Sequence, residues 1–390
     1  MSAVTSPAKS PTRPIWAEIS ESHLLHNYRF LRQRAGTDTE LLAVVKANAY
    51  GHSLEICARV LAEDGAQWLG VTSVEEAVAL RGICPTARIV AFSGVWPGEA
   101  DAVIEHGLTP VVWDEGHFNL LEKAARRLSL GARKVPVHLE IDTGMSRQGV
   151  QLPDLPAALR RFGENSPLKL EAVMTHFHSP DETAPTASQM QEFAAAVEAI
   201  VGMGIRPEFL SAGSSADVLS QSTRAVTELA RRIGARRMVR TGIALYGYAP
   251  QREGSTGLEP VLTWKTRVTS VREIEIGTTA GYGATFTARR RTRLALLPAG
   301  YADGLSRLLS NKGWALVHGR RAPIAGRVSM DQTIVDVTDV PKVAAGDEAV
   351  LIGAQDGEQI TAADLAELTG TIPYEILCAI APRVPRELVS

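Results

Sequence analysis

The 390-residue sequence predicts an α/β protein in which an N-terminal (β/α)8 TIM-like barrel is followed by an all-β C-terminal domain. Before residue 250, short apolar runs alternate eight times with segments of helical periodicity, which is the repeat of a barrel of about 250 residues. No Gly-x-Gly-x-x-Gly motif follows the first run, and this weakens the alternative of an open, doubly wound sheet. After residue 250 the apolar pattern has period two, which is typical of half-buried strands.

The eight expected barrel strands are short and rich in branched apolar residues, as strands buried on both faces are. They cover residues 41–45, 68–71, 89–92, 109–112, 136–141, 170–175, 207–210 and 237–240. Helical spacing predicts a helix over 21–33 before the first strand, and helices over 52–62, 73–81, 115–128, 155–162 and 188–201 between the strands.

The sequence divides into three expected segments. Residues 1–13 are rich in Ser, Thr, Pro and Lys without an apolar run, which is typical of a disordered arm and not of a signal peptide. Residues 14–250 make the barrel domain and residues 251–390 the β-domain. In the β-domain we expect strands over 262–268, 294–296, 314–318 and 333–337, and one helix over 362–369.

Composition excludes several classes of function. A formal net charge of −2 gives no electrostatic basis for binding nucleic acid or an anionic membrane. The three cysteines, Cys57, Cys84 and Cys378, are an odd number without CxxC spacing, so we expect neither a disulfide framework nor a metal site. No apolar run is long enough to span a bilayer. These features predict a cytoplasmic protein that acts on a small molecule.

A lysine follows the first expected strand at the point where that strand reaches the barrel mouth. Lys46 could be an ordinary lysine at a strand end. If desolvated, however, it would lose its charge, and a neutral amine attacks a carbonyl carbon to form a Schiff base. In a (β/α)8 barrel the catalytic groups lie just past the C-terminal ends of the strands, which is where Lys46 is expected.

Further polar loops follow other strands. Residues 142–147 follow the fifth strand, residues 176–178 follow the sixth, residues 211–216 follow the seventh, and residues 240–243 lie at the end of the eighth. The last two loops have small residues whose N–H groups and hydroxyls suit a phosphate, although turns and helix caps use the same residues. A lysine with a phosphate site indicates pyridoxal 5′-phosphate (PLP), and an aldolase-type lysine with a phosphorylated substrate is the alternative.

Eight motifs carry a resemblance that extends from about residue 14 to the C-terminus. They are AVVKANAYGH at 43–52, DTGMSRQG at 142–149, THF at 175–177, VRTGIALYG at 239–247, GYGATFTA at 281–288, PAGYADG at 298–304, RVSMDQ at 327–332 and YEIL at 374–377. In order and spacing the sequence resembles the alanine racemase family.

The resemblance implies a PLP-dependent interconversion of L-alanine and D-alanine that supplies D-alanine for peptidoglycan. Lys46 would hold the cofactor and act as one base, and Tyr282 from the partner of a homodimer would act on the opposite face. Two bases are needed because a racemase removes the Cα proton from one face and returns a proton to the other. Residues 14–20 would add a strand to the β-domain.

The remaining roles also follow from the resemblance. Phosphate contacts are expected from Tyr50, Ser215, Tyr374, Gly242 and Ile243, whereas His176 would lie against the cofactor ring. Arg240 would face the pyridine nitrogen, and because a guanidinium only donates, that nitrogen would stay unprotonated. The substrate carboxylate would meet Arg147 and the partner's Met330, which has Asp331 beside it, and the partner's Tyr301 would line the entrance. Taken singly, Tyr301, Met330 and Tyr374 are typical of packing.

The sequence departs from the family pattern at a few positions. Glu140 stands where many members have a carbamylated lysine, and we expect its charge to pair with Arg147 directly or through water. Ser214 replaces a usual asparagine, Ser329 a usual cysteine and His178 a usual small residue, while Asn48 is retained.

Other functions remain open at this level. A small pocket discriminates poorly between alanine and serine, so a racemase of another small amino acid is one alternative. A related PLP-dependent decarboxylase and a non-catalytic PLP-binding protein are the others. The GYGATFTA and MDQ elements disfavour the decarboxylase, and the complete second domain disfavours the binding protein.

Overall fold

The computed structural model describes residues 13–179, 183–220, 224–250 and 257–390, which fold as two compact units. One unit is residues 22–259, and the other combines residues 13–21 with residues 260–390. The arm expected over residues 1–13 lies outside the described residues, except for Arg13. No helix among the described residues is long and apolar enough to cross a membrane.

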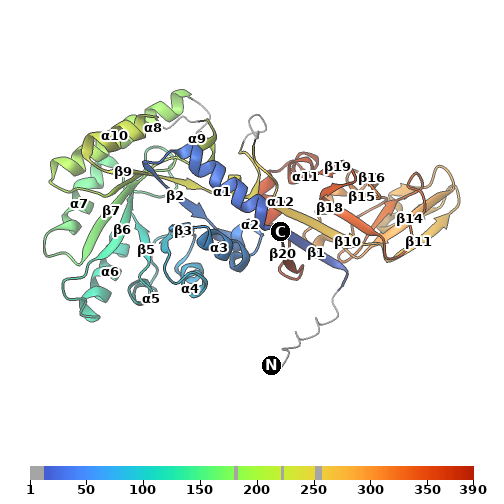
Figure 1. The fold of residues 1–390 in the computed structure, drawn as a ribbon, viewed down its shortest axis with the longest axis horizontal. Coiled ribbons are helices and arrows are strands. Elements are labelled where there is room, and N and C mark those ends of the chain that lie inside the picture. Colours follow the sequence, from blue (N-terminus) through green and yellow to red (C-terminus); the bar gives the residue numbers. More distant parts are fainter. Residues whose placement is uncertain (1–12, 180–182, 221–223, 251–256) are drawn as a thin grey trace. The chain divides into compact units, whose positions relative to one another are not determined.

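Residues 22–259 contain a closed barrel of parallel strands, which confirms the predicted fold class (Figure 1). The strands are β2 (Thr39–Val44), β3 (Trp68–Val71), β4 (Arg88–Ala91), β5 (Thr109–Val112), β6 (Val135–Glu140), β7 (Leu168–Met174), β8 (Phe209–Ser211) and β9 (Arg236–Thr241). β9 pairs in parallel with β2, in the register Leu41 to Val239, and so closes the barrel. Strand edges differ from the predicted ones by at most two residues.

Helices connect the strands. They are α1 (Glu21–Ala35), α3 (Leu54–Glu63), α4 (Val74–Ile83), α5 (Ala100–Glu105), α6 (Glu115–Arg127), α7 (Leu155–Leu159), α8 (Thr183–Gly202), α9 (Ser215–Ser220) and α10 (Arg224–Ile233). The prediction missed α5, α9 and α10. α5 and α9 have six residues each, too few to show periodicity. α10 had a usable signal, since Val226, Leu229 and Ala230 are buried at helical spacing.

The second unit is rich in β-structure. Its largest sheet has the order β16-β15-β18-β10-β1-β20, with β19 paired to β18. These strands are β1 (Ile15–Ser20), β10 (Leu262–Arg267), β15 (Trp314–Val317), β16 (Arg320–Pro323), β18 (Glu348–Gln355), β19 (Glu358–Ile360) and β20 (Arg386–Val389). β1 runs antiparallel to β10 and parallel to β20, so the first strand of the chain is an interior strand of this sheet.

Smaller elements complete this unit. A three-stranded sheet has the order β11-β14-β17, and β12 pairs with β13. Their bounds are β11 (Ser270–Ile274), β12 (Thr279–Ala280), β13 (Phe286–Thr287), β14 (Thr292–Leu297) and β17 (Thr333–Asp336). The expected helix is α11 (Ala362–Thr369), and a second one, α12 (Pro373–Cys378), was not predicted. The unit is therefore β-rich, with two helices near its end.

The loop after β2 is a left-handed turn. Helix-like hydrogen bonding runs over α2 (Lys46–Tyr50), but Ala47, Asn48, Ala49 and Tyr50 have φ of 52°, 54°, 55° and 53°. This region favours glycine, and each L-residue in it costs roughly 1–2 kcal/mol. Only asparagine among these residue types enters the region readily, so the sequence gives little indication of the turn.

Hydrogen bonds from several elements hold the left-handed turn. The N–H of Ala47 donates to Oε1 of Glu76 on α4 at 2.8 Å, and Oδ1 of Asn48 accepts from the N–H of Leu54 at 2.7 Å. The hydroxyl of Tyr246 donates to the carbonyl oxygen of Val44 at 3.0 Å. Lys46 thus lies between strand β2 and a turn that other elements of the barrel unit hold in place. These contacts fix the point at which the backbone of Lys46 leaves the barrel.

We predict that Ala47→Gly raises the free energy of unfolding by up to about 1 kcal/mol, because glycine adopts positive φ without a steric cost, although its freer unfolded chain offsets part of the gain. Ala195→Gly, on the exposed side of the right-handed helix α8, should lower it by about 1 kcal/mol. Urea denaturation measures both. An equal loss of stability in the two variants would contradict the left-handed turn.

Candidate active site

The C-terminal ends of the barrel strands bring most of the predicted barrel residues together. Lys46 follows β2, Glu140 ends β6, His176 follows β7 and Arg240 lies on β9. Burial lowers the pKa of His176 to about 3, and the positive charges of Arg240, Arg147 and Lys46 contribute to the shift. These three cations therefore lie close enough to His176 to act on it, and its imidazole is neutral at physiological pH.

Arg240 is anchored by four hydrogen bonds. Its Nη1 donates to the carbonyl oxygen of Ser211 at 2.7 Å and to Ser211 Oγ at 2.9 Å. Its Nη2 donates to the carbonyl oxygen of Thr175 at 2.7 Å and to Nδ1 of His176 at 3.2 Å. Burial lowers the pKa of Arg240, and the charges of Glu140 and Asp217 oppose the shift. In the described part of the chain, its Nε–H donates to no side chain or backbone group.

The Arg240 contact decides the tautomer of His176. A guanidinium has no acceptor, so Nδ1 of the neutral ring must accept from it. The ring proton then resides on Nε2, which becomes a hydrogen-bond donor. His176 is therefore an oriented neutral donor, and not a further cation of the barrel mouth.

A cluster of polar groups lies where the loops after β8 and β9 meet. Ser215 Oγ accepts from the N–H of Gly242 at 3.0 Å and from the N–H of Ala244 at 3.4 Å. A Cβ on residue 242 would lie only 2.3 Å from the hydroxyl oxygen of Tyr50. Glycine is thus required for the close approach of Tyr50, and the 3₁₀ turn Ile243–Tyr246 begins at Ile243, whose first N–H groups have no partner within the turn.

Glu140 is buried, with 3% of its surface exposed, and it accepts a hydrogen bond from a residue that the sequence did not indicate. Its Oε2 accepts from Nε2 of Gln148 at 2.6 Å. A direct ion pair with Arg147, one of the two predicted arrangements, is absent from the residues that the structure describes. The physical reason is that Arg147 lies on the exposed side of the loop, whereas Gln148 also donates to the carbonyl oxygen of Phe92 and is held near Glu140.

Burial raises the pKa of Glu140. The hydrogen bond from Gln148 and the charges of Arg240 and Arg147 oppose this shift without cancelling it. Glu140 is thus the carboxylate that balances the cations of the barrel mouth, at a distance from Arg147. Sequence inspection missed Gln148, since only the fold brings it against Glu140 eight positions earlier.

The segment carrying Arg147 is a closed loop. Oδ1 of Asp142 accepts from the N–H groups of Gly144 and Ser146, each at 3.0 Å, and the N–H of Asp142 donates to the carbonyl oxygen of Val150 at 3.0 Å. At Gly149, φ is 117° and a Cβ would lie 2.4 Å from the nitrogen of Asp142. The DTGMSRQG motif therefore forms a tight, hydrogen-bonded loop that carries Arg147 on its exposed side.

The other predicted residues lie in the β-rich unit. Tyr282 begins a 3₁₀ turn, Tyr282–Ala284, between β12 and β13, and 70% of its surface is exposed. Gly281 and Gly283 flank it with φ of 75° and 71°. A Cβ at Gly283 would lie 3.1 Å from Nη1 of Arg327, so the turn packs on that guanidinium. The phenol is presented at the tip of a short hairpin.

Tyr301 and Met330 lie on neighbouring loops of the same unit. The N–H of Tyr301 donates to the carbonyl oxygen of Ser329, and the N–H of Ala302 to that of Met330, each at 3.0 Å. A Cβ at Gly300 would lie 2.3 Å from both of those carbonyl oxygens. The motifs PAGYADG and RVSMDQ, far apart in sequence, therefore form one folded patch.

An ionic network supports this patch. The fully buried Asp303 accepts from Arg13, from Nε of Arg383 at 2.8 Å and from the N–H of Gly300 at 2.9 Å. Nη2 of Arg383 donates to Oδ1 of Asp331 at 2.7 Å. Burial acts to raise the pKa of Asp303, but the donors outweigh it and the pKa is lowered. Asp331 is thereby tied to the Tyr301 loop.

Tyr374, on α12, is half-buried, and burial raises its pKa to about 12. Its phenol therefore stays protonated at physiological pH and can donate to an anion. Ser214 caps α9 together with Asp217, since the N–H and Oγ of Ser214 donate to Oδ2 of Asp217 at 2.6 and 3.0 Å. His178 is exposed, and its Nδ1 lies 2.8 Å from Ser179 Oγ.

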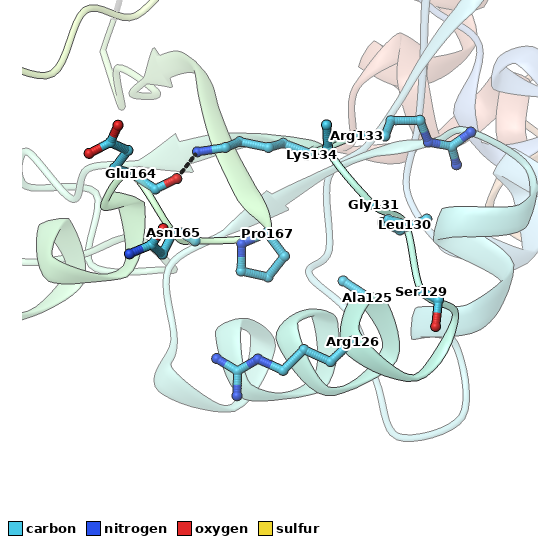
Figure 2. A pocket seen from close by; sticks show the side chains of 12 residues that line it. Ala125, Arg126, Ser129, Leu130, Gly131, Arg133, Lys134, Glu164, Asn165 and Pro167 are labelled. Carbon is cyan, nitrogen blue, oxygen red and sulfur yellow. Dashed lines mark hydrogen bonds between the residues drawn. The ribbon is translucent and has the colours of Figure 1, made fainter.

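A hollow of about 600 Å³ lies elsewhere on the barrel (Figure 2). Residues 125–126, 129–134 and 164–167 line it, and Nζ of Lys134 donates to the carbonyl oxygen of Glu164 at 2.8 Å. These segments precede β6 and β7, so the hollow is at the N-terminal ends of the strands. Barrel chemistry takes place at the opposite ends, and the hollow is not part of the candidate site. No group of three or more potential metal ligands occurs among the described residues.

Comparisons with known proteins identify the family of the chain. Residues 19–250 match the family model described as alanine racemase, N-terminal domain, and residues 261–388 match alanine racemase, C-terminal domain. An alanine racemase of Symbiobacterium thermophilum is 42% identical over 378 residues, which cover 96% of this chain and 97% of that protein.

Solved structures give the same result. Alanine racemase from Streptomyces lavendulae superposes with a TM-score of 0.88 at 34% identity and covers 98% of both chains. Alanine racemase from Bartonella henselae, solved with covalently bound pyridoxal phosphate, has a TM-score of 0.83 at 28% identity and covers 97% of this chain and all of the other. This chain belongs to the alanine racemase family.

Proposed function

We propose that the protein interconverts L-alanine and D-alanine with pyridoxal 5′-phosphate as cofactor. The observation that carries the proposal is the grouping of Lys46, the neutral His176 and the anchored Arg240 at one barrel mouth. An amine, an oriented neutral donor and a permanent cation in one place suit a carbonyl cofactor whose ring nitrogen accepts a hydrogen bond.

The residues present fit this cofactor. Arg240 has an Nε–H without a partner among the described residues, which a pyridine nitrogen can accept. The polar cluster at Gly242 includes Ser215 Oγ and the Tyr50 hydroxyl, and the N–H of Ile243 follows in the chain; hydroxyl and N–H donors of this kind suit a phosphate. Tyr374 remains protonated and would donate to the same group.

In the proposed reaction, different residues transfer the protons and bind the substrate. When bound, the cofactor supplies an electron sink that acidifies the substrate Cα–H. Lys46 holds or receives a proton at Nζ on one face of Cα, and Tyr282 does so at its phenol oxygen on the other. Arg147 would bind the substrate carboxylate with the N–H of the partner's Met330, and the partner's Tyr301 would line the approach. Because a guanidinium stays protonated and only donates, Arg240 would hold the cofactor's ring nitrogen as an acceptor and so limit side reactions.

We further propose a homodimer in which the Tyr282 of one subunit serves the Lys46 of the other. The exposure of Tyr282 supports this, because 70% of its surface faces solvent. A base needs a drier and more positive environment than solvent provides. Ile276, Leu308, Met330 and Ile372 of the same unit are exposed as well, which is consistent with a surface that a partner covers.

The product sets the cellular role that we propose. D-alanine would be supplied in the cytoplasm for peptidoglycan synthesis.

The direct test is incubation of the cofactor-loaded protein with L-alanine in deuterated water. We expect deuterium at Cα together with loss of optical rotation. Release of carbon dioxide would assign a decarboxylase, and cofactor binding without exchange at Cα would assign a binding protein. Parallel incubation with L-serine measures the breadth of the substrate pocket.

The shared site predicts complementation between two inactive variants. Lys46→Ala should lose the visible absorption band of the bound cofactor, and Tyr282→Phe should lose racemisation while keeping that band. Mixed and allowed to exchange subunits, they should recover about a quarter of wild-type activity, because half of the dimers are mixed and each of these has one intact site. Full activity of Tyr282→Phe alone would refute the second base. No recovery on mixing would place both bases in one chain.

We expect substitution of Glu140 to weaken substrate affinity without lowering the stability of the fold. Burial raises the pKa of Glu140, so its ionised form is disfavoured in the fold, and Glu140→Gln should leave Tm unchanged or higher. The variant loses the charge that acts on Arg147, so the KM for alanine should rise roughly 3- to 10-fold.

The wild-type KM should also rise as the pH falls through the raised pKa of Glu140, and the variant should lack this dependence. Steady-state kinetics from pH 5 to 9 on both proteins measure the effect. Glu192→Gln, exposed on α8, is the control. An unchanged KM in Glu140→Gln would rule out the proposed role.

A further inference from the structure

A buried glutamine behind the barrel mouth has no part in the chemistry described above. Gln189 lies on α8 (Thr183–Gly202), and only 2% of its surface is exposed. Glutamine is mostly an exposed residue, and a buried amide without partners would cost stability. A buried glutamine at this position is therefore expected to be hydrogen-bonded to its surroundings.

Both N–H donors of the Gln189 amide have an acceptor, and its oxygen has a donor. Its Oε1 accepts from the N–H of His178 at 3.0 Å. Its Nε2 donates to Oγ1 of Thr143 at 3.2 Å and to the carbonyl oxygen of His176 at 3.3 Å. Thr143 belongs to the loop after β6, and the two histidines to the loop after β7. One side chain thus joins two loops of the barrel mouth to a helix.

The partners also fix the orientation of the amide. The backbone N–H of His178 can only donate and the carbonyl oxygen of His176 can only accept. A flipped amide would place a carbonyl oxygen against a carbonyl oxygen and an NH2 group against an N–H. The contacts therefore hold Gln189 in one rotational state, and through it the path of the chain from residue 176 to residue 178.

Further hydrogen bonds connect the partners of Gln189 with Arg240. Thr143 Oγ1 lies 2.7 Å from Thr175 Oγ1, and both threonines are buried. The carbonyl oxygen of Thr175 accepts from Nη2 of Arg240, the same nitrogen that donates to Nδ1 of His176. The main chain at Thr175 and His176 is thus held from the helix side by Gln189 and from the barrel side by Arg240.

We propose that Gln189 is a positioning residue that sets the His176 ring and the loop carrying Arg147 for the reaction. This inference rests on the proposed function of the barrel mouth. Gln189 touches neither of the reacting groups, and it acts through the backbone of His176 and the hydroxyl of Thr143. Its amide donors matter here, and not its volume alone.

Gln189→Met tests this, because methionine keeps the length of the side chain and removes the amide. In the cofactor-loaded enzyme we expect kcat to fall about 10- to 100-fold, as misplacement of positioned groups by about 1 Å does, with KM changed less than about threefold. The visible circular dichroism of the bound cofactor should also change, because this signal reports the asymmetry of its surroundings. Gln189→Glu keeps an acceptor for His178 but, when ionised, has no donor for His176, so it should not restore kcat.

Gln191→Met is the matched control, since Gln191 is exposed on the same helix. It should keep wild-type kcat and circular dichroism. Each variant is measured at a temperature well below its Tm, so that unfolded protein does not contribute. Wild-type kcat and an unchanged cofactor spectrum in folded Gln189→Met, or full activity in Gln189→Glu, would overturn the inference.

The proposed racemase activity and the positioning role of Gln189 can be refuted separately. A wild-type protein that does not exchange the Cα proton of alanine refutes the proposed function, while the cofactor circular dichroism of the variants still decides the role of Gln189. An active wild type with an unaffected Gln189→Met refutes only the positioning role.

Discussion

The left-handed turn after β2 is the constraint on which the barrel mouth depends. Four successive residues, Ala47 to Tyr50, have positive φ, and three of them are types that avoid this conformation. Such strain persists only where surrounding contacts over-determine the backbone, and Glu76, Asn48 and Tyr246 supply those contacts here. The turn brings Tyr50, four residues after Lys46, close to Gly242, so the same strained segment serves the amine and the polar cluster at Gly242.

Charge balance explains why the mouth suits anionic ligands. Lys46, Arg147 and Arg240 all act on His176, and Glu140 is the buried carboxylate that opposes two of them. A neutral His176 avoids adding a further cation to this group. A phosphate and a carboxylate would complete the balance, since buried charges are stable only when they are paired. The electrostatics and the proposed amino-acid substrate are therefore consistent with each other.

Local sequence patterns predicted the barrel strands well and the positioning residues poorly, for a physical reason. Strands β3 and β5 have the predicted bounds, because apolar runs buried on both faces leave a clear local signal. Lys46 and His176 could be placed by the rule that barrel chemistry follows strand ends. Gln148 and Gln189 could not, because their partners are set by tertiary contacts and no local pattern marks them. The predicted direct ion pair between Glu140 and Arg147 was wrong, because opposite charges alone do not show whether two side chains can reach each other.

The two proposed bases belong to different compact units of the chain, and this separation has a consequence for the reaction. Lys46 is fixed by a strained turn within the barrel unit, whereas Tyr282 stands on an exposed hairpin tip of the β-rich unit. Each base is therefore positioned by its own fold, independently of the other. A phenol at such a tip becomes an effective base only when another surface removes water from it. If the partner subunit provides that surface, association of the chains completes the second base, and activity depends on dimer formation.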